Sequence, residues 1–322
     1  MSPSNNPAAQ ALWTVGPGRA ELRPVALIAP DNESVVVQAL VSGISRGTES
    51  LVFQGHVPES EWDRMRCPFQ DGDFPFPVKY GYAMVGTLEE TPNTRVFTLH
   101  PHQTHFVVPK DAATPVPDDV TNERAVLAPQ METALNATWD GGPRIGDRIA
   151  VVGGGVIGCL VAYLCGRIAG TEVTLIDIDP GRGKIASALG AAFATPADAP
   201  TNCDLVFHAS GRSEGLELAL TLAGFEAAIV ELSWYGANAV NVGLGGAFHS
   251  QRLTLLSSQV GNVAPVRRAR WPHGRRLAKA LSLCADPALD CLVADETPFA
   301  DLPQKLPTIL GAPGALCHLV RY

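Results

Sequence analysis

The fold of this chain is decided by the stretch Ile149-Ala150-Val151-Val152-Gly153-Gly154-Gly155-Val156-Ile157-Gly158. Its four leading apolar residues predict a buried strand, and the glycines that follow predict a tight turn that opens a helix. In a Gly-x-Gly-x-x-Gly turn the first glycine permits the bend, the second lets a pyrophosphate approach backbone N–H groups, and the third lets helix and strand pack closely. We therefore predict that a dinucleotide binds at Gly153, Gly155, Val156, Ile157 and Gly158.

A carboxylate at the end of the next predicted strand supports this interpretation. Asp177 lies 19 residues beyond Gly158, close to the spacing of about 20 residues at which an acidic side chain accepts hydrogen bonds from the adenosine ribose. The same carboxylate repels a 2′-phosphate, so the sequence favours NAD over NADP as the cofactor. Arg182, five residues farther along, could still reach such a phosphate, which leaves NADP open as the alternative.

Around the glycine turn, predicted strands alternate with predicted helices. The strands are expected at residues 148–153, 172–177, 204–209 and 227–232, and the helices at 156–168, 181–189 and 215–222. Such alternation implies an α/β domain with a parallel sheet and right-handed crossovers, the doubly wound Rossmann arrangement. Ser210 and Ser233 follow two of these strands, whose carboxyl ends face the ligand crevice in such sheets. We therefore add both serines to the predicted cofactor-binding residues.

The N-terminal part of the chain has a different pattern. Short β-type runs occupy residues 34–41, 82–88, 95–99 and 105–109, and a Pro-containing loop is expected over 56–78. Short strands at this spacing predict a small β-barrel or sandwich.

The C-terminal part is expected to hold an Arg-rich helix after Gly261, and then a final helix and strand that end at Tyr322. We interpret the arginines of the first helix as a solvated face rather than an anion-binding patch. They are Arg267, Arg268, Arg270, Arg275 and Arg276.

Composition restricts the class of protein. The chain has 322 residues, 46% of them hydrophobic and 17% charged, which excludes a disordered or collagen-like chain. A formal net charge of −8 disfavours nucleic acid and anionic membranes as partners. Its seven cysteines form no Cys-x-x-Cys pair, so we expect reduced thiols, and the first residues contain no secretory signal pattern. We predict a cytoplasmic protein.

Two further motifs resemble those of medium-chain dehydrogenases/reductases. Ser42-Gly43-Ile44-Ser45-Arg46-Gly47-Thr48-Glu49 is similar to the family's first zinc-ligand stretch, and Lys79-Tyr80-Gly81-Tyr82-Ala83-Met84-Val85-Gly86 resembles its Gly-His-Glu stretch. The tail from Leu289 to Tyr322, with Thr297-Pro298-Phe299-Ala300-Asp301-Leu302, resembles its closing segment. The resemblance implies a GroES-like β-barrel catalytic domain over residues 1–130, a Rossmann domain over 131–257 and a return segment over 258–322. It also implies a homodimer that acts on a small-molecule substrate.

The positions of the family's zinc ligands hold unsuitable residues. Ser45 replaces the cysteine, Tyr82 replaces the histidine, and the neighbouring glutamate is Ala83. The third ligand region, Leu127-Ala128-Pro129-Gln130, offers neither cysteine nor carboxylate. Because a catalytic zinc needs three protein ligands of Cys, His or carboxylate type, we expect no zinc. The four-Cys lobe that binds structural zinc in the family is also missing, since Cys67 is the only cysteine before Cys159.

Among zinc-free relatives, the stretch from Gly43 to Glu49 most resembles bacteriochlorophyllide 3-hydroxyethyl dehydrogenases, and quinone reductases more distantly. The resemblance implies a zinc-independent, NAD(H)-dependent oxidoreductase that transfers a hydride between nicotinamide and an alcohol or carbonyl. The alternatives are a quinone or enone reductase, and a non-catalytic dinucleotide-binding sensor or scaffold.

Without zinc, another group must polarise the substrate oxygen. The candidates for this catalytic role are Tyr82, Thr48, Glu49, His100 and His102. On an extended strand His100 and His102 would face the same side, where they could shuttle protons, hold a metal or have a structural role. The resemblance also implies that Arg46 meets the pyrophosphate and that Thr133 lies near the nicotinamide. We interpret Glu132, beside Thr133, as a helix-end carboxylate rather than a buried acid.

Overall fold

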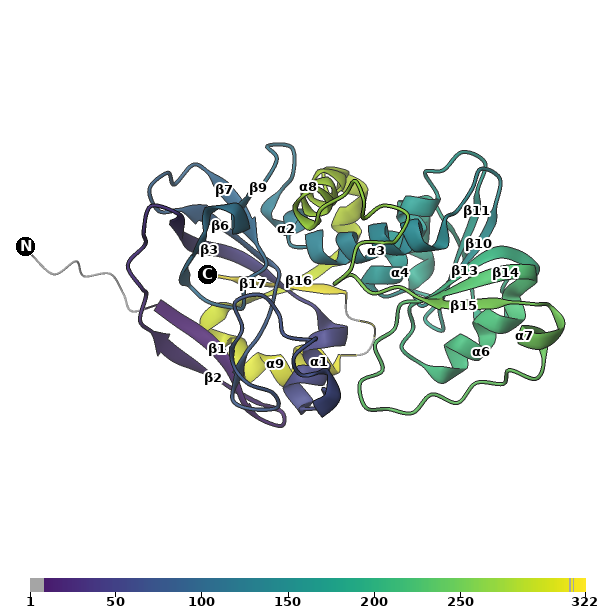
Figure 1. Ribbon diagram of the computed structural model, residues 1–322, viewed down its shortest axis with the longest axis horizontal. Coiled ribbons are helices and arrows are strands. Elements are labelled where there is room, and N and C mark those ends of the chain that lie inside the picture. The colour runs from purple at the N-terminus through teal and green to yellow at the C-terminus, as the bar shows by residue number, and fades with distance from the viewer. Residues whose placement is uncertain (1–8, 313, 315) are drawn as a thin grey trace, which may run out of the picture. The chain divides into compact units, whose positions relative to one another are not determined.

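The computed structural model describes residues 9–312, 314 and 316–322 (Figure 1). The chain divides into two compact units. Unit 1 contains Met1–Leu127 and Val293–Tyr322, and unit 2 contains Ala128–Leu292.

Unit 2 is built on one parallel sheet of six strands, in the order β12-β11-β10-β13-β14-β15 (Figure 1). This order runs outward in both directions from β10, which confirms the predicted doubly wound α/β fold. The four predicted strands correspond to β10, β11, β13 and β14, whereas the short edge strands β12 and β15 were missed. The strands are β10 (Arg148–Val152), β11 (Glu172–Ile176), β12 (Ala192–Ala194), β13 (Cys203–His208), β14 (Ala223–Glu231) and β15 (Thr254–Ser257).

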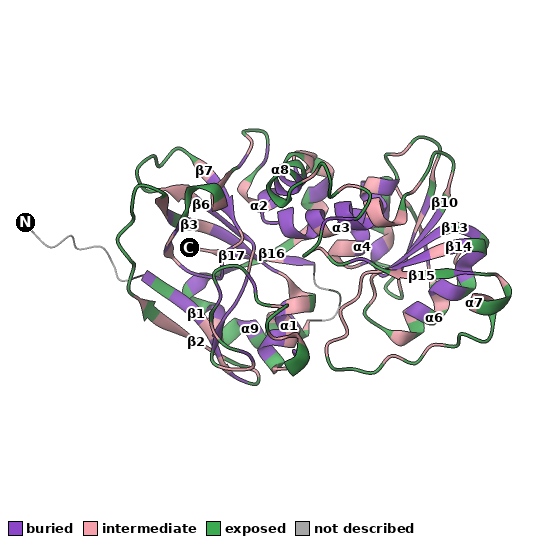
Figure 2. Ribbon diagram, in the orientation of Figure 1, coloured by how far each residue is buried: buried purple, intermediate pink, exposed green. Residues whose placement is uncertain are grey.

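Helix α4 (Val156–Cys165), which follows the glycine turn, packs on β10 and β11 of this sheet through its apolar residues. Seven of its ten residues are buried, and the central strand β10 is buried from Ile149 to Val152 (Figure 2). A stretch this apolar resembles a membrane span in sequence, but among the described residues no helix combines the length and apolarity needed to cross a membrane. The remaining helices are α3 (Ala128–Gly141), α5 (Arg182–Leu189), α6 (Ser213–Leu222), α7 (Ala247–Ser250) and α8 (His273–Leu283).

Unit 1 is rich in strands, as its short β-type runs predicted. The predicted runs correspond to β3 (Ser34–Ile44), β6 (Met84–Leu88), β7 (Arg95–Thr98) and β8 (His105–Pro109). They belong to a sheet with the order β16-β17-β3-β6-β7-β9, in which β8 also pairs with β3. A second sheet has the order β2-β1-β5-β4, and its hairpin of β1 (Ala9–Gly16) and β2 (Arg19–Val25) was missed.

The other elements of unit 1 complete these sheets. The closing segment contributes β16 (Val293–Pro298), α9 (Leu302–Gly311) and β17 (Cys317–Arg321). The predicted final helix and strand, α9 and β17, are therefore confirmed, and β17 pairs with β3. The short elements are β4 (Asp71–Gly72), β5 (Val78–Lys79), β9 (Thr114–Pro115), α1 (Arg46–Gln54) and α2 (Asn122–Ala125).

The predicted return segment over residues 258–322 is wrong in its first half, because residues 258–292 group with unit 2. The reason is α8, which is fixed on α3 by Arg276. This buried guanidinium donates to Glu132 Oε1 at 3.0 Å and to Asn136 Oδ1 at 3.0 Å. Glu132 is therefore a buried, ion-paired acid, and its interpretation as a helix-end carboxylate was wrong.

The Arg-rich helix is also shorter than predicted. Pro272 precedes α8, and the residue before a proline disfavours helical geometry, so α8 begins at His273. Arg267, Arg268 and Arg270 consequently lie in the turns that precede the helix rather than on its face.

All seven cysteines are free, and only Cys291 is partly exposed.

Candidate functional site

The glycine turn of unit 2 has the geometry that its sequence predicts. Gly153 adopts a φ of +110°, and a Cβ there would lie 2.7 Å from the backbone nitrogen of Ser210. A Cβ at Gly158 would lie 1.8 Å from the Gly153 carbonyl oxygen, so only glycine lets α4 pack this closely on β10. By contrast, the space around Gly155, which precedes α4, is open. An open, glycine-lined helix N-terminus fits the pyrophosphate of a dinucleotide, and Val156 and Ile157 supply the first helical residues.

Asp177 closes one side of this turn. It follows β11, and its carboxylate accepts hydrogen bonds from the N–H groups of Gly154 (2.6 Å) and Asp179 (2.9 Å). Each carboxylate oxygen has a further lone pair with which it can accept from a ribose hydroxyl. The position therefore fits the predicted adenosine-ribose contact.

Arg182, the residue that left NADP open, lies beside Asp177 in the fold. A Cβ at Gly154 would lie 3.1 Å from both Arg182 Cγ and Asp177 Oδ2, so these two side chains flank the same glycine. Arg182 is buried, and its Nε is 3.6 Å from Asp179 Oδ2.

The predicted serines lie at the carboxyl ends of β13 and β14, where they belong to a polar cluster. Ser210 Oγ is 2.6 Å from His208 Nε2, and Ser233 Oγ accepts from the Gly211 N–H at 3.1 Å. His208 Nδ1 lies 2.7 Å from Glu231 Oε2. His208 and Glu231 were not predicted from the sequence, although each is a polar residue that ends an apolar strand.

Four of the five predicted catalytic residues of unit 1 come together. The Tyr82 hydroxyl donates to Ser45 Oγ at 2.6 Å and interacts with the Thr48 hydroxyl. Burial raises the pKa of Tyr82 to about 12, which the hydrogen bonds to Ser45 and Thr48 only partly oppose. The phenol is therefore protonated at neutral pH and is available as a hydrogen-bond donor.

Glu49 and His102 form a buried pair behind Ser45. Glu49 Oε1 accepts from the Ser45 N–H at 2.7 Å, and Glu49 Oε2 accepts from His102 Nε2 at 3.1 Å. His102 Nδ1 lies 2.7 Å from Ser42 Oγ, which is 2.9 Å from the Tyr322 hydroxyl. These contacts join α1, β3, the segment before β8 and the end of the chain into one hydrogen-bonded network.

His100 stands apart from this network. The segment from His100 to His102 forms no strand, so the expected common side of the two histidines is wrong. The His100 ring stacks on Phe69 and Phe106, and its Nδ1 donates to the Pro101 carbonyl at 2.9 Å. Burial lowers the pKa of His100 to about 3. A neutral, stacked imidazole fits a packing role rather than a proton shuttle.

Two residues transferred by resemblance, Arg46 and Thr133, donate to backbone carbonyls of their own units. Arg46 begins α1, and its Nη1 donates to the Ala312 carbonyl at 3.1 Å. The Thr133 hydroxyl donates to the Pro129 carbonyl within α3 at 3.0 Å. Their cofactor contacts stay predictions.

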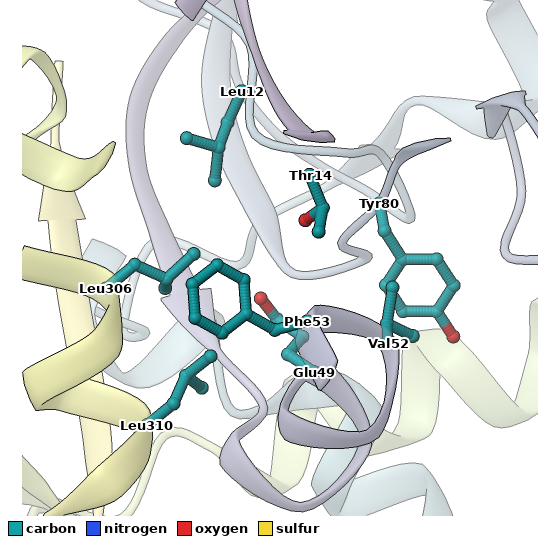
Figure 3. A pocket seen from close by; sticks show the side chains of 8 residues that line it. All are labelled: Leu12, Thr14, Glu49, Val52, Phe53, Tyr80, Leu306 and Leu310. Carbon is teal, nitrogen blue, oxygen red and sulfur yellow. The ribbon is translucent and has the colours of Figure 1, made fainter. Parts of the chain in front are cut away.

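Glu49 also lines a small cavity in unit 1 (Figure 3). Its volume of about 10 Å³ is close to the minimum that holds one water molecule. Figure 3 shows the Glu49 carboxylate beside the Phe53 ring, and Leu306 and Leu310 also line the cavity. The cavity is too small for an organic substrate.

The residues at the family's zinc positions do not fit zinc. Ser45 and Tyr82 carry neutral hydroxyls, of which Tyr82 donates a hydrogen bond to Ser45, and the Ala83 side chain has no ligand atom. Within the described part of the chain, no group of three or more His, Cys, Asp or Glu side chains could hold a metal ion.

Comparison with known proteins supports a medium-chain dehydrogenase fold. No protein-family model matches the chain. L-Threonine 3-dehydrogenase of Rhizobium johnstonii is 29% identical over 119 residues, which are 36% of this chain and 33% of that protein. The chain therefore matches about a third of the length of this curated relative.

Solved structures match the chain over almost its whole length. A short chain alcohol dehydrogenase from E. coli CFT073, complexed with NADH, aligns with a TM-score of 0.76 and 17% identity, covering 98% of this chain and 100% of that one. A candidate zinc-binding dehydrogenase from Sinorhizobium meliloti 1021, bound to NADP, aligns with a TM-score of 0.78 and 18% identity over 98% of this chain and 100% of that one. At these identities the likeness shows the fold.

Proposed function

We propose that the protein is a zinc-independent, NAD(H)-dependent oxidoreductase that transfers a hydride between nicotinamide and an alcohol or carbonyl substrate. The observation that carries the proposal is the glycine turn of unit 2, with an open helix N-terminus at Gly155 and the Asp177 carboxylate beside it. The dehydrogenases named above, one with NADH and one with NADP, support this activity.

In this proposal unit 2 binds the cofactor, and unit 1 supplies the donors for the substrate oxygen. A bound nicotinamide supplies the hydride chemistry, and the protein supplies orientation and proton transfer. Tyr82 donates to Ser45, which leaves the Ser45 hydroxyl hydrogen for a further acceptor. The Ser45 hydroxyl is therefore the proposed donor to an oxygen that gains negative charge, and Tyr82 replaces the proton that Ser45 passes on. Glu49 holds Ser45 through its backbone N–H, so we treat Glu49 and His102 as positioning residues.

We expect purified protein to contain no stoichiometric zinc, because its residues at the ligand positions cannot hold the metal. Prolonged treatment with a chelator should leave NADH affinity and thermal stability unchanged. Elemental analysis before and after chelation, combined with fluorescence titration of NADH, checks both statements. If the purified protein contains stoichiometric zinc and loses its activity when the zinc is removed, the proposal that the reaction is independent of zinc is wrong.

We expect NADH to bind at least several-fold more tightly than NADPH, because a 2′-phosphate would meet the Asp177 carboxylate. The Asp177→Ser substitution should narrow this difference, and Asp177→Asn, which keeps the shape but removes the charge, should do the same. Fluorescence titration of both nucleotides measures the ratio. Tighter binding of NADPH by the unaltered protein would show instead that Arg182 sets the preference.

Three finer assignments stay proposals. The resemblance to bacteriochlorophyllide 3-hydroxyethyl dehydrogenases favours a secondary alcohol or its ketone, with a quinone or enone as the alternative substrate. A non-catalytic dinucleotide-binding role would need only unit 2. A homodimer could form along β15, an edge strand on which Leu255 is exposed.

A further inference from the structure

The segment from Ser258 to Asn262 leaves the carboxyl end of β15, and the proposed reaction does not use it. In the parallel register, Ser257 of β15 lies opposite Glu231 of β14. The strands β13 and β10 end in the same row, at His208 and Val152. The glycine turn follows Val152 directly, so the segment and the turn leave the sheet along one edge.

The other half of the proposed dinucleotide is already assigned to this edge. The glycine turn after β10 fits the pyrophosphate, and Asp177 after β11 fits the adenosine ribose. A doubly wound sheet has two halves that each take one nucleotide, and β13, β14 and β15 form the half opposite β11. Because neighbouring strands lie about 4.8 Å apart, β14 and β15 end about 10 to 14 Å from β10. The nicotinamide nucleoside is therefore expected along the ends of β13, β14 and β15.

Helix α8 binds the carbonyl groups of this segment. Arg276, of which only 3% is exposed, donates from Nη2 to the Val260 carbonyl at 2.6 Å and from Nη1 to the Asn262 carbonyl at 3.4 Å. His273 Nε2 donates to the Gly261 carbonyl at 3.1 Å. Three consecutive carbonyl groups of the segment are therefore bound to α8.

Helix α3 holds both Arg276 and the start of the segment. Its residues Glu132, Asn136 and Asp140 are four positions apart, so they share one face of the helix. Glu132 Oε1 and Asn136 Oδ1 each accept from Arg276 at 3.0 Å. Asp140 Oδ2 accepts from Asn136 Nδ2 at 3.1 Å and from the Ser258 hydroxyl at 2.6 Å. The segment is thus fixed at both of its ends to two helices of unit 2.

The segment keeps two backbone donors for a ligand. Among the hydrogen bonds of the described residues, none uses the N–H of Gln259 or of Val260. Gln259 is exposed and Val260 is partly exposed, so these donors are not enclosed in the core. The Gln259 carbonyl accepts from the Asn262 N–H at 3.3 Å. Because a trans peptide is planar, the Val260 N–H in the same peptide is directed the opposite way, out of the turn.

We propose that Arg276, held by Glu132 and Asn136, is a positioning residue of the cofactor site. It fixes the segment from Ser258 to Asn262 so that the free N–H groups donate to an oxygen of the nicotinamide nucleoside. The inference rests on the proposed function, because it assumes that unit 2 binds NADH. It gives the buried Arg276 a role in binding besides the attachment of α8 to α3.

A comparison of NADH with ADP tests this role without a known substrate, because ADP keeps the adenosine and the pyrophosphate but lacks the nicotinamide nucleoside. In Arg276→Lys the ammonium keeps the charge beside Glu132, but it cannot reproduce the planar fork of donors that reaches Asn136 and Val260 together. NADH affinity should fall about five- to tenfold, which corresponds to one lost hydrogen bond. ADP affinity should change less than about twofold, because its contacts lie at β10 and β11. Isothermal titration calorimetry with the full chain measures both affinities.

A second variant leaves the buried ion pair intact and decides the question if Arg276→Lys does not fold. Ser258→Ala removes only the hydroxyl that joins the segment to Asp140. It should lower NADH affinity about two- to fivefold and leave ADP affinity unchanged. Lys279→Gln, at an exposed position of α8, is the matched control and should leave both affinities unchanged.

The outcomes separate this inference from the function beneath it. Equal losses of NADH and ADP affinity in the variants would show that Arg276 and Ser258 only stabilise the fold, and would overturn the inference. Unchanged NADH affinity in the variants, or an unaltered protein that binds NADH no more tightly than ADP, would also overturn it, while the dinucleotide site would stand. If the unaltered protein binds neither nucleotide, the proposed function and the inference are both wrong.

Discussion

The Tyr82→Phe substitution should lower kcat by about 10²–10⁴, the usual contribution of a positioned acid, while NADH affinity stays unchanged. The phenylalanine keeps the ring and its contacts and deletes only the hydroxyl that donates to Ser45 at 2.6 Å. Because the pKa of Tyr82 is about 12, the lost group is a protonated donor throughout the neutral range. Steady-state kinetics with the most rapidly reduced carbonyl, together with NADH titration, measures both quantities.

Tyr80→Phe is the matched control for this experiment. Tyr80 packs edge-on against Tyr82 with 6.0 Å between ring centroids, and its hydroxyl is directed to the Met65 carbonyl at 3.4 Å. Deletion of that hydroxyl should leave kcat nearly unchanged. If Tyr82→Phe is as active as Tyr80→Phe, the proton must come from Ser45, Thr48, Glu49 or water, and the assignment of Tyr82 is wrong.

Replacement of one member of the Glu49 and His102 pair should cause the largest loss of stability. Both side chains are buried, with exposed fractions of 9% and 1%, so His102→Ala leaves a buried carboxylate without its imidazole partner. Removal of one partner that leaves a buried hydrogen-bonding group unpaired costs about 1–3 kcal/mol of the free energy of unfolding. Urea unfolding, monitored by circular dichroism, measures the loss in free energy of unfolding. The transition of unit 1 must be resolved from that of unit 2.

An exposed ion pair of the same unit provides the comparison. Arg64 lies 3.4 Å from Glu61, and 73% of its side chain is exposed. Arg64→Ala should therefore cost less than about 1 kcal/mol. Joint replacement of Glu49 and His102 by apolar residues should cost less than the sum of the single replacements, because neither polar group remains unpaired. A loss for His102→Ala no larger than that for Arg64→Ala would contradict the account of the pair.

The dinucleotide site was predictable because its determinants are local in sequence. Gly153, Gly155 and Gly158 lie in one turn, and the spacing to Asp177 is set by one helix and one strand. The expected orientation of His100 was wrong, because the segment from His100 to His102 lies between β7 and β8 and forms no strand.

The two buried histidine pairs could not be predicted from such local patterns. His208 and Glu231 meet only through the register of β13 and β14, and Glu49 and His102 meet only through the packing of α1 against a distant segment. Arg276 was missed for a related reason. An arginine is usually solvated, and only its burial against Glu132 reveals that it attaches α8 to unit 2.

The most direct test of the central claim is the oxidation of NADH by chelator-treated protein with a panel of aldehydes, ketones, quinones and enones. We predict that the protein reduces at least one carbonyl compound of the panel, which is measured as the loss of NADH absorbance. Chelation should not change the rate. Tight binding of NADH without turnover of any member of the panel would contradict the account and would favour a non-catalytic dinucleotide-binding protein.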